Sequence, residues 1–303
     1  MIKARLLKKM DSYKCQSPVL FLVFNRPDLT ARVFERIRQV RPAELYIAVD
    51  GPRHGRQGEA EAVAQVGDIV KKVDWDCKVE TLFRTENLGC AKAIIGAVSW
   101  FFEHVDAGII LEDDVLPNPE MFRFFDSTLE YYRDVDAVVD ISGFNPLDRF
   151  SRRCRRPLLT KYGNIWGWAT WADRWRKFSP EYHCGAEVVQ AEFNQMLSYY
   201  GTRFEACYRK AYHEMIVQRQ VDTWDAGYVM YRITSGGHSI MPPVNLVENI
   251  GFSADATHTT GSNPFVPPRY DLQLKQLDYI RAGWYDRLSF LFLKKFPRLL
   301  NFI

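Results

Sequence analysis

The sequence predicts an α/β fold in which helices flank a mostly parallel sheet. Through the first half of its 303 residues, short apolar runs alternate with longer amphipathic ones, which is the pattern of βα units. Polar residues follow the apolar runs directly, as expected where parallel strands end at one edge of a sheet. We therefore expect an α/β half over 17–150 and a differently patterned half over 151–303, together forming one continuous domain.

The expected strands are short runs of aliphatic, β-branched and aromatic residues. They cover 18–24, 45–49, 78–83, 107–111 and 137–141. The expected helices carry apolar residues three and four apart, as Leu29, Val33 and Ile37 show for the first of them. They cover 28–40, 59–72, 91–105 and 119–133, with two more near 187–199 and 203–218.

The composition is that of an ordinary globular protein, with 47% hydrophobic and 25% charged residues. The formal net charge of +3 is too small to indicate a nucleic-acid partner. No stretch reaches the roughly 20 apolar residues that a bilayer crossing needs, and the N-terminus lacks the apolar core of a signal peptide. The six cysteines stand apart from one another, which favours reduced thiols in the cytoplasm.

Polar side chains follow four of the expected strands, and they should meet at the carboxyl edge of the sheet. Any one of these groups could be a solvated loop, but the four together indicate a ligand site. They are Asn25 and Arg26 after the first strand, Asp50 and Gly51 after the second, Arg84 and Asn87 after the third, and Glu112, Asp113 and Asp114 after the fourth.

Three consecutive carboxylates end the fourth strand, in the stretch GIILEDDVLP. Because like charges repel, a cation is the expected compensation. Mg²⁺ and Mn²⁺ fit, since such ions bind one or two carboxylates together with substrate phosphates. The spacing is wrong for a calcium loop of the EF-hand type and for the separated acid pair of a glycoside hydrolase. If the strand continues through the acids, Glu112 and Asp114 point to one side of the sheet and Asp113 to the other.

The second half contains a tryptophan-rich stretch, NIWGWATWADRW. Its tryptophans could simply pack in the core. The glycine between two of them instead suggests an apolar wall with a close backbone approach, suited to the face of a sugar. On that hypothesis Trp166, Gly167 and Trp168 contact substrate.

Six segments occur in an order that resembles the metal-dependent glycosyltransferases of the GT-A fold: VFNRPDLT, AVDG, RTENLG, LEDDV, WGWATW and VDTWDAG. The chain is most similar to the bacterial family-2-like nucleotide-diphospho-sugar transferases and, more distantly, to the Golgi N-acetylglucosaminyltransferase I family, over roughly 19–260. The resemblance implies an inverting transfer of a sugar from a nucleotide-sugar donor, first of all a UDP-sugar, to a glycan or lipid-linked acceptor, with Mn²⁺ or Mg²⁺ as cofactor. It also implies a Rossmann-like donor half, an acceptor and lid half, and a place in bacterial polysaccharide assembly.

The resemblance further implies roles for individual residues. Asp114 is the expected direct ligand of the metal, Asp113 would contact the ribose or the donor sugar, and Glu112 would contact the donor sugar. Arg26 would lie beside the nucleotide, and Asp50 is similar to the acid that accepts a hydrogen bond from the base. Further candidates for the substrate pocket are Asn25, Arg84, Asn87 and Lys92, the last of which could equally be a surface lysine.

An inverting transfer also needs a base that accepts the proton of the acceptor hydroxyl. The candidates are Asp222, Asp225 and Glu248. Trp224-Asp225 resembles the Trp-Asp-Asp element of the Golgi family, although Ala226 stands where the second acid would be. We take Asp225 as the base, with the alternative that it is only the N-cap of a helix over GYVMYRITS.

One histidine is a candidate metal ligand. His258 lies in the polar segment ENIGFSADATHTTG, and the resemblance implies a contact with the metal or the diphosphate. Imidazole is a common ligand of transition metals. The alternative is an ordinary surface histidine.

Two basic stretches are left over, 152–156 and the amphipathic C-terminal segment 284–303. They could contact the inner face of a membrane as a peripheral surface, or form a solvated loop and a packed terminal helix. The sequence gives no indication of the oligomeric state.

Two other function classes compete with glycosyl transfer. A sugar nucleotidyltransferase shares the α/β nucleotide fold, but such enzymes usually carry a glycine-rich phosphate loop after the first strand, and VFNRPDLT has no glycine. A non-catalytic sugar- or protein-binding module would leave the three adjacent carboxylates without a role.

Overall fold

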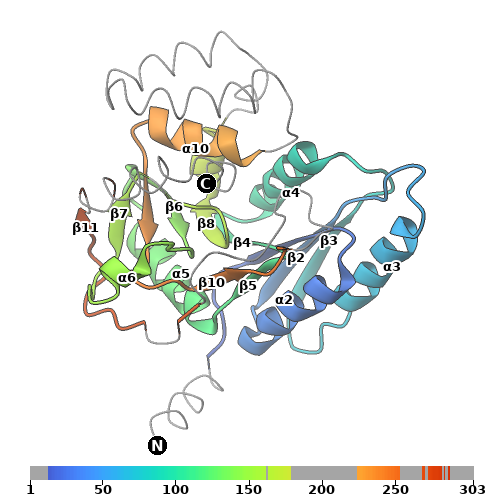
Figure 1. The fold of residues 1–303 in the computed structure, drawn as a ribbon, viewed down its shortest axis with the longest axis horizontal. Coiled ribbons are helices and arrows are strands. Elements are labelled where there is room, and N and C mark those ends of the chain that lie inside the picture. The colour runs from blue at the N-terminus through green and yellow to red at the C-terminus, as the bar shows by residue number, and fades with distance from the viewer. Residues whose placement is uncertain are drawn as a thin grey trace, which may run out of the picture.

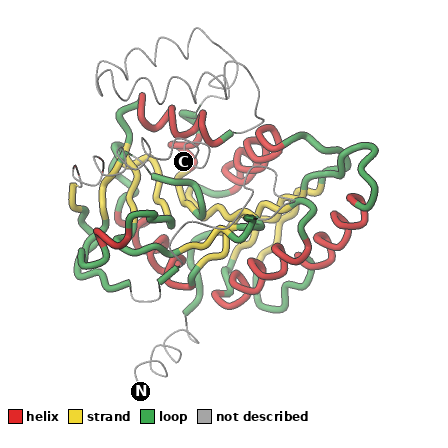
Figure 2. The backbone as a smooth tube through the Cα atoms, viewed as in Figure 1, coloured by secondary structure: helices red, strands yellow, loops and turns green. Residues whose placement is uncertain are grey.

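The computed structural model of the chain describes residues 13–161, 163–178, 224–252, 268–269, 272–281, 283 and 286. In this part of the chain nine strands form one sheet, and Figures 1 and 2 show helices on both of its sides. The α/β class and the mostly parallel, helix-flanked sheet are therefore confirmed.

The predicted elements of the first half form close to their expected bounds. The strands are β1 (Val19–Val23), β2 (Glu44–Val49), β3 (Lys78–Phe83), β4 (Ala107–Glu112) and β6 (Val138–Ser142). The helices are α2 (Pro27–Val40), α3 (Glu59–Val70), α4 (Cys90–His104) and α5 (Pro119–Tyr131). The two helices expected near 187–199 and 203–218 lie outside the described residues.

Four further strands join those of the first half: β7 (Leu158–Thr160), β8 (Trp168–Trp171), β9 (His238–Met241) and β11 (Ile280–Arg281). The order of the sheet is β11-β7-β9-β6-β8-β4-β1-β2-β3. The strands β3, β2, β1 and β4 run parallel, as do β6 and β9, whereas β8 lies antiparallel between β4 and β6. Strands from both halves of the sequence thus build the same sheet.

Two apolar layers cover the two faces of the sheet. Side chains alternate along β1, so that Val19 and Phe21 pack toward α2 and α5 while Leu20 and Leu22 pack toward α4. All of these side chains are buried, which explains why β1 is a continuous apolar run. This double packing fixes the carboxyl ends of β1 and β4, where the polar residues begin.

Three further helices follow β6 in the described part of the chain: α6 (Asp148–Ser151), α7 (Ala172–Trp175) and α10 (Asp225–Thr234). Asp225 is the first residue of α10 and not the residue before it. The alternative role of Asp225 as the cap of this helix stays a prediction.

A buried ion pair fixes α10 on the sheet. Arg232 is fully buried, and its Nη1 donates to Asp140 Oδ2 of β6 at 2.6 Å. Its other amine donates to the carbonyl oxygen of Gly163. Because Arg232 follows Asp225 by seven residues, about two helical turns, both lie on one face of the helix. The ion pair therefore also sets where Asp225 points.

Replacing Arg232 by methionine should lower the free energy of unfolding by about 3–5 kcal/mol, because the Asp140 carboxylate is left buried without its partner. Urea unfolding monitored by circular dichroism measures this. The matched control is Arg133→Met, which removes an exposed pair with Glu130 and should change stability by less than about 1 kcal/mol. Equal stabilities of the two variants would contradict a bracing role for the buried pair.

Candidate functional site

The three adjacent carboxylates lie where β4 turns into a second, smaller sheet. Glu112 is the last residue of β4, Asp113 and Asp114 form the turn, and β5 (Val115–Pro117) follows at once. The strand has ended, so the expectation that Glu112 and Asp114 share one face by strand alternation does not apply. Both aspartates are instead placed by the turn, and β5 pairs with β10 (Val247–Asn249).

Arg26 holds the two aspartates. It follows β1, whose end lies beside the end of β4 because the two strands are parallel neighbours. Its Nη1 donates to Asp114 Oδ2 at 2.9 Å, and its Nε donates to Asp113 Oδ2 at 3.2 Å. Its remaining amine donates to the other oxygen of Asp113. The predicted meeting of these strand ends is thus observed, and Arg26 compensates charge in the acid cluster.

One guanidinium does not neutralise three carboxylates. Burial, followed by the charge of Asp114, raises the pKa of Glu112 to about 8. Burial also raises the pKa of Asp113, and Arg26 opposes that shift. Glu112 keeps some solvent contact although protein surrounds it on most sides. The cluster therefore contains more carboxylates than positively charged side chains in contact with them.

The candidate base Asp225 is the first residue of α10, and its charge makes a minor contribution to the raised pKa of Glu112, after burial and the charges of nearer groups. Asp225 is partly exposed at the start of α10. Of the other candidates, Glu248 lies in β10 opposite Leu116, and Asp222 lies outside the described residues.

A glycine that the sequence analysis missed lies against the expected metal ligand. A Cβ atom on Gly251 would be 2.4 Å from Asp114 Oδ2, which is too close for any side chain. The neighbouring Ile250 donates its backbone N–H to the carbonyl oxygen of Asp114 at 2.7 Å. The available signal was the glycine directly after the strand-like segment that contains Glu248.

Asp50 braces a loop. Its carboxylate accepts from Asn87 Nδ2 at 2.9 Å and from the backbone N–H of Leu88 at 3.2 Å. Gly51 allows this packing, since a Cβ there would lie 2.5 Å from the backbone of Glu86. Burial raises the pKa of Asp50, while the backbone donors and Arg84 oppose the shift. Asp50 and Asn87 are thus hydrogen-bonded to each other.

Three other predicted substrate-binding residues have neighbours outside the acid cluster or are exposed. Arg84 is largely buried 3.8 Å from Asp50 Oδ1, and burial lowers its pKa. Asn25 donates to Glu59 at 2.9 Å, which ties the end of β1 to the start of α3. Lys92 is exposed in the first turn of α4.

The tryptophan-rich stretch is mainly core. Trp168 is 1% exposed in the central strand β8 and packs against Trp224 and Tyr228, with ring centroids 5.5 and 5.0 Å away. The hypothesis of an exposed sugar-binding wall is wrong for Trp168, because neighbouring aromatic rings cover it. Trp166 is 7% exposed and packs against Phe144.

Gly167 does make the predicted close approach, but to protein. Its φ of +60° lies in the left-handed region, which favours glycine. A Cβ there would contact Val247 of β10 at 3.0 Å and Met121 of α5 at 3.1 Å. This contact packs the start of β8 against the small β5–β10 sheet, beside the acid cluster.

The acid cluster suits a divalent cation only together with a substrate. In the part of the chain that the structure describes, no group of three or more His, Cys, Asp or Glu side chains could hold a metal ion. His258 lies outside that part. The surplus negative charge at Glu112–Asp114 nevertheless fits a hard cation such as Mg²⁺, which binds one or two carboxylates and takes its other ligands from phosphates and water.

Comparisons with known proteins do not assign a family. No protein-family profile and no curated protein matches the chain. Among solved structures, a UDP-glucose pyrophosphorylase complexed with UDP-glucose is similar with a TM-score of 0.36 and 9% identity, over 92% of this chain and 99% of that one. The inositol-1-phosphate CTP transferase from T. maritima gives 0.32 and 10%, over 54% and 74%, and HddC from Yersinia pseudotuberculosis gives 0.31 and 9%, over 52% and 78%. Likenesses this low carry no argument about activity, so the function is inferred from the chain's own residues.

The described helices include none that combines the length and the apolarity needed to span a membrane.

Glu112→Gln should abolish a pH-dependent loss of stability. Because the folded protein raises the pKa of Glu112 from 4.5 to about 8, folding retains a proton that the unfolded chain has lost in this range. The resulting stabilisation is complete below the unfolded pKa and disappears as the pH rises through the folded pKa. Each pKa unit corresponds to about 1.4 kcal/mol, so wild type should lose more than about 1 kcal/mol relative to Glu112→Gln across this window.

Urea unfolding at a series of pH values measures the difference between the two proteins. Glu61→Gln is the control, because Glu61 is exposed on α3, and its profile should follow that of wild type. Parallel profiles for wild type and Glu112→Gln would show that Glu112 is not held in its protonated form.

Proposed function

We propose that the chain is a glycosyltransferase of the GT-A type. It would move a sugar from a nucleoside-diphosphate donor, with a UDP-sugar as our first expectation, to a hydroxyl of a glycan or lipid-linked acceptor. The observation that carries the proposal is the cluster of Glu112, Asp113 and Asp114 at the carboxyl ends of the parallel strands β1 and β4, with Arg26 as its only contacting cation among the described residues. Asp225, whose charge acts on Glu112, is the candidate base.

Donor binding would use the surplus negative charge of the cluster. Asp114 would hold a Mn²⁺ or Mg²⁺ ion, which when bound supplies positive charge to the leaving diphosphate. Arg26 reaches both Asp113 and Asp114, so it can keep Asp113 oriented while Asp114 turns to the ion. Gly251 leaves the space that Asp114 Oδ2 occupies, and Ile250 fixes the backbone behind it.

The transfer itself would depend on Asp225. The acceptor oxygen forms a bond to the anomeric carbon, the bond from that carbon to the diphosphate oxygen breaks, and Asp225 takes the proton of the acceptor hydroxyl. Glu112 would hydrogen-bond a hydroxyl of the donor sugar, and Asp225 would be the group for proton abstraction.

The proposal places the enzyme in the cytoplasm, in the assembly of a bacterial surface polysaccharide or glycoconjugate. In the described part of the chain Cys15, Cys77 and Cys154 are free thiols, which suits a reducing compartment.

Asp225→Asn should separate binding from chemistry. Asparagine keeps the shape of the side chain but cannot accept the proton, so turnover should fall about 10²- to 10⁴-fold while donor affinity stays near that of wild type. The measurement is single-turnover transfer at saturating donor, together with a melting curve. Asp173→Asn is the matched control, because it changes an exposed aspartate in the first turn of α7, and it should transfer like wild type.

An Asp225→Asn enzyme with undiminished turnover would contradict Asp225 as the base and would leave Asp222 or Glu248, or a retaining mechanism. The anomeric configuration of the product, read by NMR, distinguishes an inverting from a retaining mechanism.

Release of the nucleoside diphosphate is the expected chemistry. Formation of a nucleoside triphosphate from the donor and pyrophosphate would instead identify a sugar nucleotidyltransferase and overturn the proposal.

A further inference from the structure

A cluster of exposed cations surrounds the short helix α6. Residues 149–155 include four exposed arginines and one exposed aromatic side chain, that of Phe150, which is 47% exposed. We call this surface, with the lysine described next, the α6 patch. Its members in this segment are Arg149, Phe150, Arg152, Arg153 and Arg155.

A second segment adds a fifth cation. Lys275 is exposed, and its backbone N–H donates to the carbonyl oxygen of Arg155 at 2.7 Å, so the two residues are neighbours on the surface. The neighbouring acids Asp148 and Asp278 form ion pairs with residues outside the patch. Asp148 pairs with Arg269, and Asp278 pairs with Arg156. Among the described residues, none forms an ion pair with any of the five cations of the patch.

Among the described residues, no acid offsets the charge of the patch. The formal net charge of the whole chain is only +3, yet five exposed cations without an ion-pair partner in the described part of the chain lie in these two segments. Like charges so close together repel each other, so an anionic surface would stabilise this arrangement. Guanidinium groups bind phosphates through two parallel hydrogen bonds, which favours phosphate as the anion.

The aromatic ring favours a lipid surface over a nucleic acid or a soluble anion. The guanidinium of Arg149 lies 4.5 Å from the centroid of the Phe150 ring, and the ring is still half exposed. An exposed aromatic side chain among basic residues is typical of the membrane interface, where the ring enters the headgroup region and the cations meet lipid phosphates.

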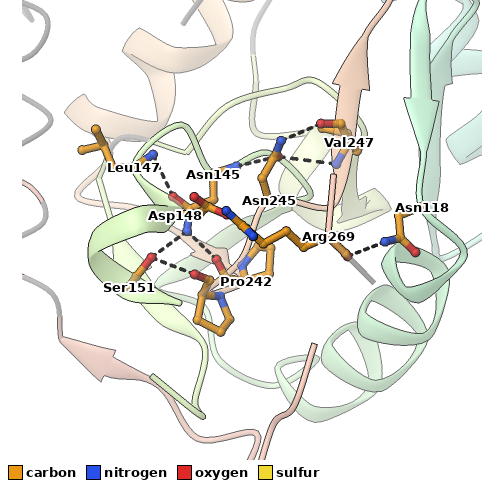
Figure 3. A network of polar contacts seen from close by, with 10 residues as sticks. Asn118, Asn145, Leu147, Asp148, Ser151, Pro242, Asn245, Val247 and Arg269 are labelled. Atoms are coloured by element: carbon orange, nitrogen blue, oxygen red, sulfur yellow. Dashed lines mark hydrogen bonds and ion pairs between the residues drawn. The ribbon is translucent and has the colours of Figure 1, made fainter. Parts of the chain in front are cut away.

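Figure 3 shows a network of polar contacts that includes Asp148 and Ser151 of α6. Asn145 Nδ2 donates to the carbonyl oxygen of Pro242 at 2.7 Å, and Ser151 Oγ donates to that of Pro243 at 2.8 Å. Both side chains are fully buried and hold α6 against the segment that leads to β10. Arg149 lies in this helix, and the other three arginines of the patch follow it directly.

The same network connects the patch to the acid cluster. Asn245 Oδ1 accepts from the backbone N–H of Asn145 at 3.2 Å, and Asn245 Nδ2 donates to Val247 of β10 at 2.8 Å. The strand β10 leads directly to Ile250, whose N–H holds Asp114. A surface bound at the α6 patch would thus have a fixed position relative to the acid cluster.

We infer that the α6 patch docks the protein on an anionic lipid bilayer. Docking by the patch is independent of the reaction. Its purpose, the presentation of a lipid-linked acceptor to the site, rests on the proposed function. The patch supplies charge from five side chains and one aromatic anchor, which suits reversible, peripheral binding.

The test is cosedimentation with vesicles of phosphatidylcholine alone and with vesicles that also contain phosphatidylglycerol. Wild type should bind only the anionic vesicles, and added salt should weaken the binding. The triple variant Arg152→Ala, Arg153→Ala, Arg155→Ala should bind about a hundredfold more weakly, because each basic residue near an anionic surface contributes about fivefold. Phe150→Ala should bind a few-fold more weakly without a change in salt dependence.

The control is a second triple variant with the same net charge, Arg32→Ala, Arg56→Ala, Arg133→Ala, whose side chains are exposed elsewhere. It should bind vesicles like wild type, and melting curves should show that all variants fold. Transfer to a soluble acceptor should be unchanged by the patch substitutions, which separates failure of docking from failure of the proposed function.

Three results would overturn the inference. One is equal vesicle binding by wild type and the patch variant, which would assign any membrane contact to another segment. Another is equal loss of binding in both triple variants, which would show an effect of net charge alone. The third is a patch variant that loses binding to RNA or DNA while its vesicle binding is intact, which would identify a nucleic-acid surface.

Discussion

The contact between Arg26 and the two aspartates is the interaction on which the site depends. It joins the ends of β1 and β4, which the parallel sheet places side by side. Burial, followed by the charge of Asp114, raises the pKa of Glu112 to about 8 against the opposing charge of Arg26, and Asp225 adds a minor contribution from α10. Charged groups from the end of β1, the turn after β4 and the start of α10 thus act on one another. Because carboxylates outnumber cations among them, a divalent cation that binds together with substrate phosphates is the expected ligand.

Much of the fold could be predicted because the βα pattern is local. The bounds of β1, β3 and α2 follow from runs of apolar residues and their spacing, and the strand ends meet as the parallel arrangement requires. The position of β8 could not be predicted, since its place between β4 and β6 is a long-range pairing. For the same reason the sequence suggested that Trp168 contacts a ligand, whereas its side chain is buried in the protein core.

The site was predicted in part. Arg26, Asp113 and Asp114 could be found because each follows a strand, and the resemblance pointed to Asp225. Gly251 and the bracing role of Asp50 could not, because both depend on atoms from distant segments that lie within van der Waals or hydrogen-bond distance. Residues that act through packing leave little trace in a single sequence, whereas clustered charges are visible at once.

The most direct test of the central claim is calorimetry of UDP binding with and without Mn²⁺, in wild type and in Asp114→Ala. If the acid cluster binds the donor diphosphate through a cation, wild type should bind UDP strongly only with Mn²⁺, and folded Asp114→Ala should lose that metal-dependent affinity. Undiminished, metal-dependent binding in Asp114→Ala, or equal binding by wild type in the absence of the metal, would contradict the account.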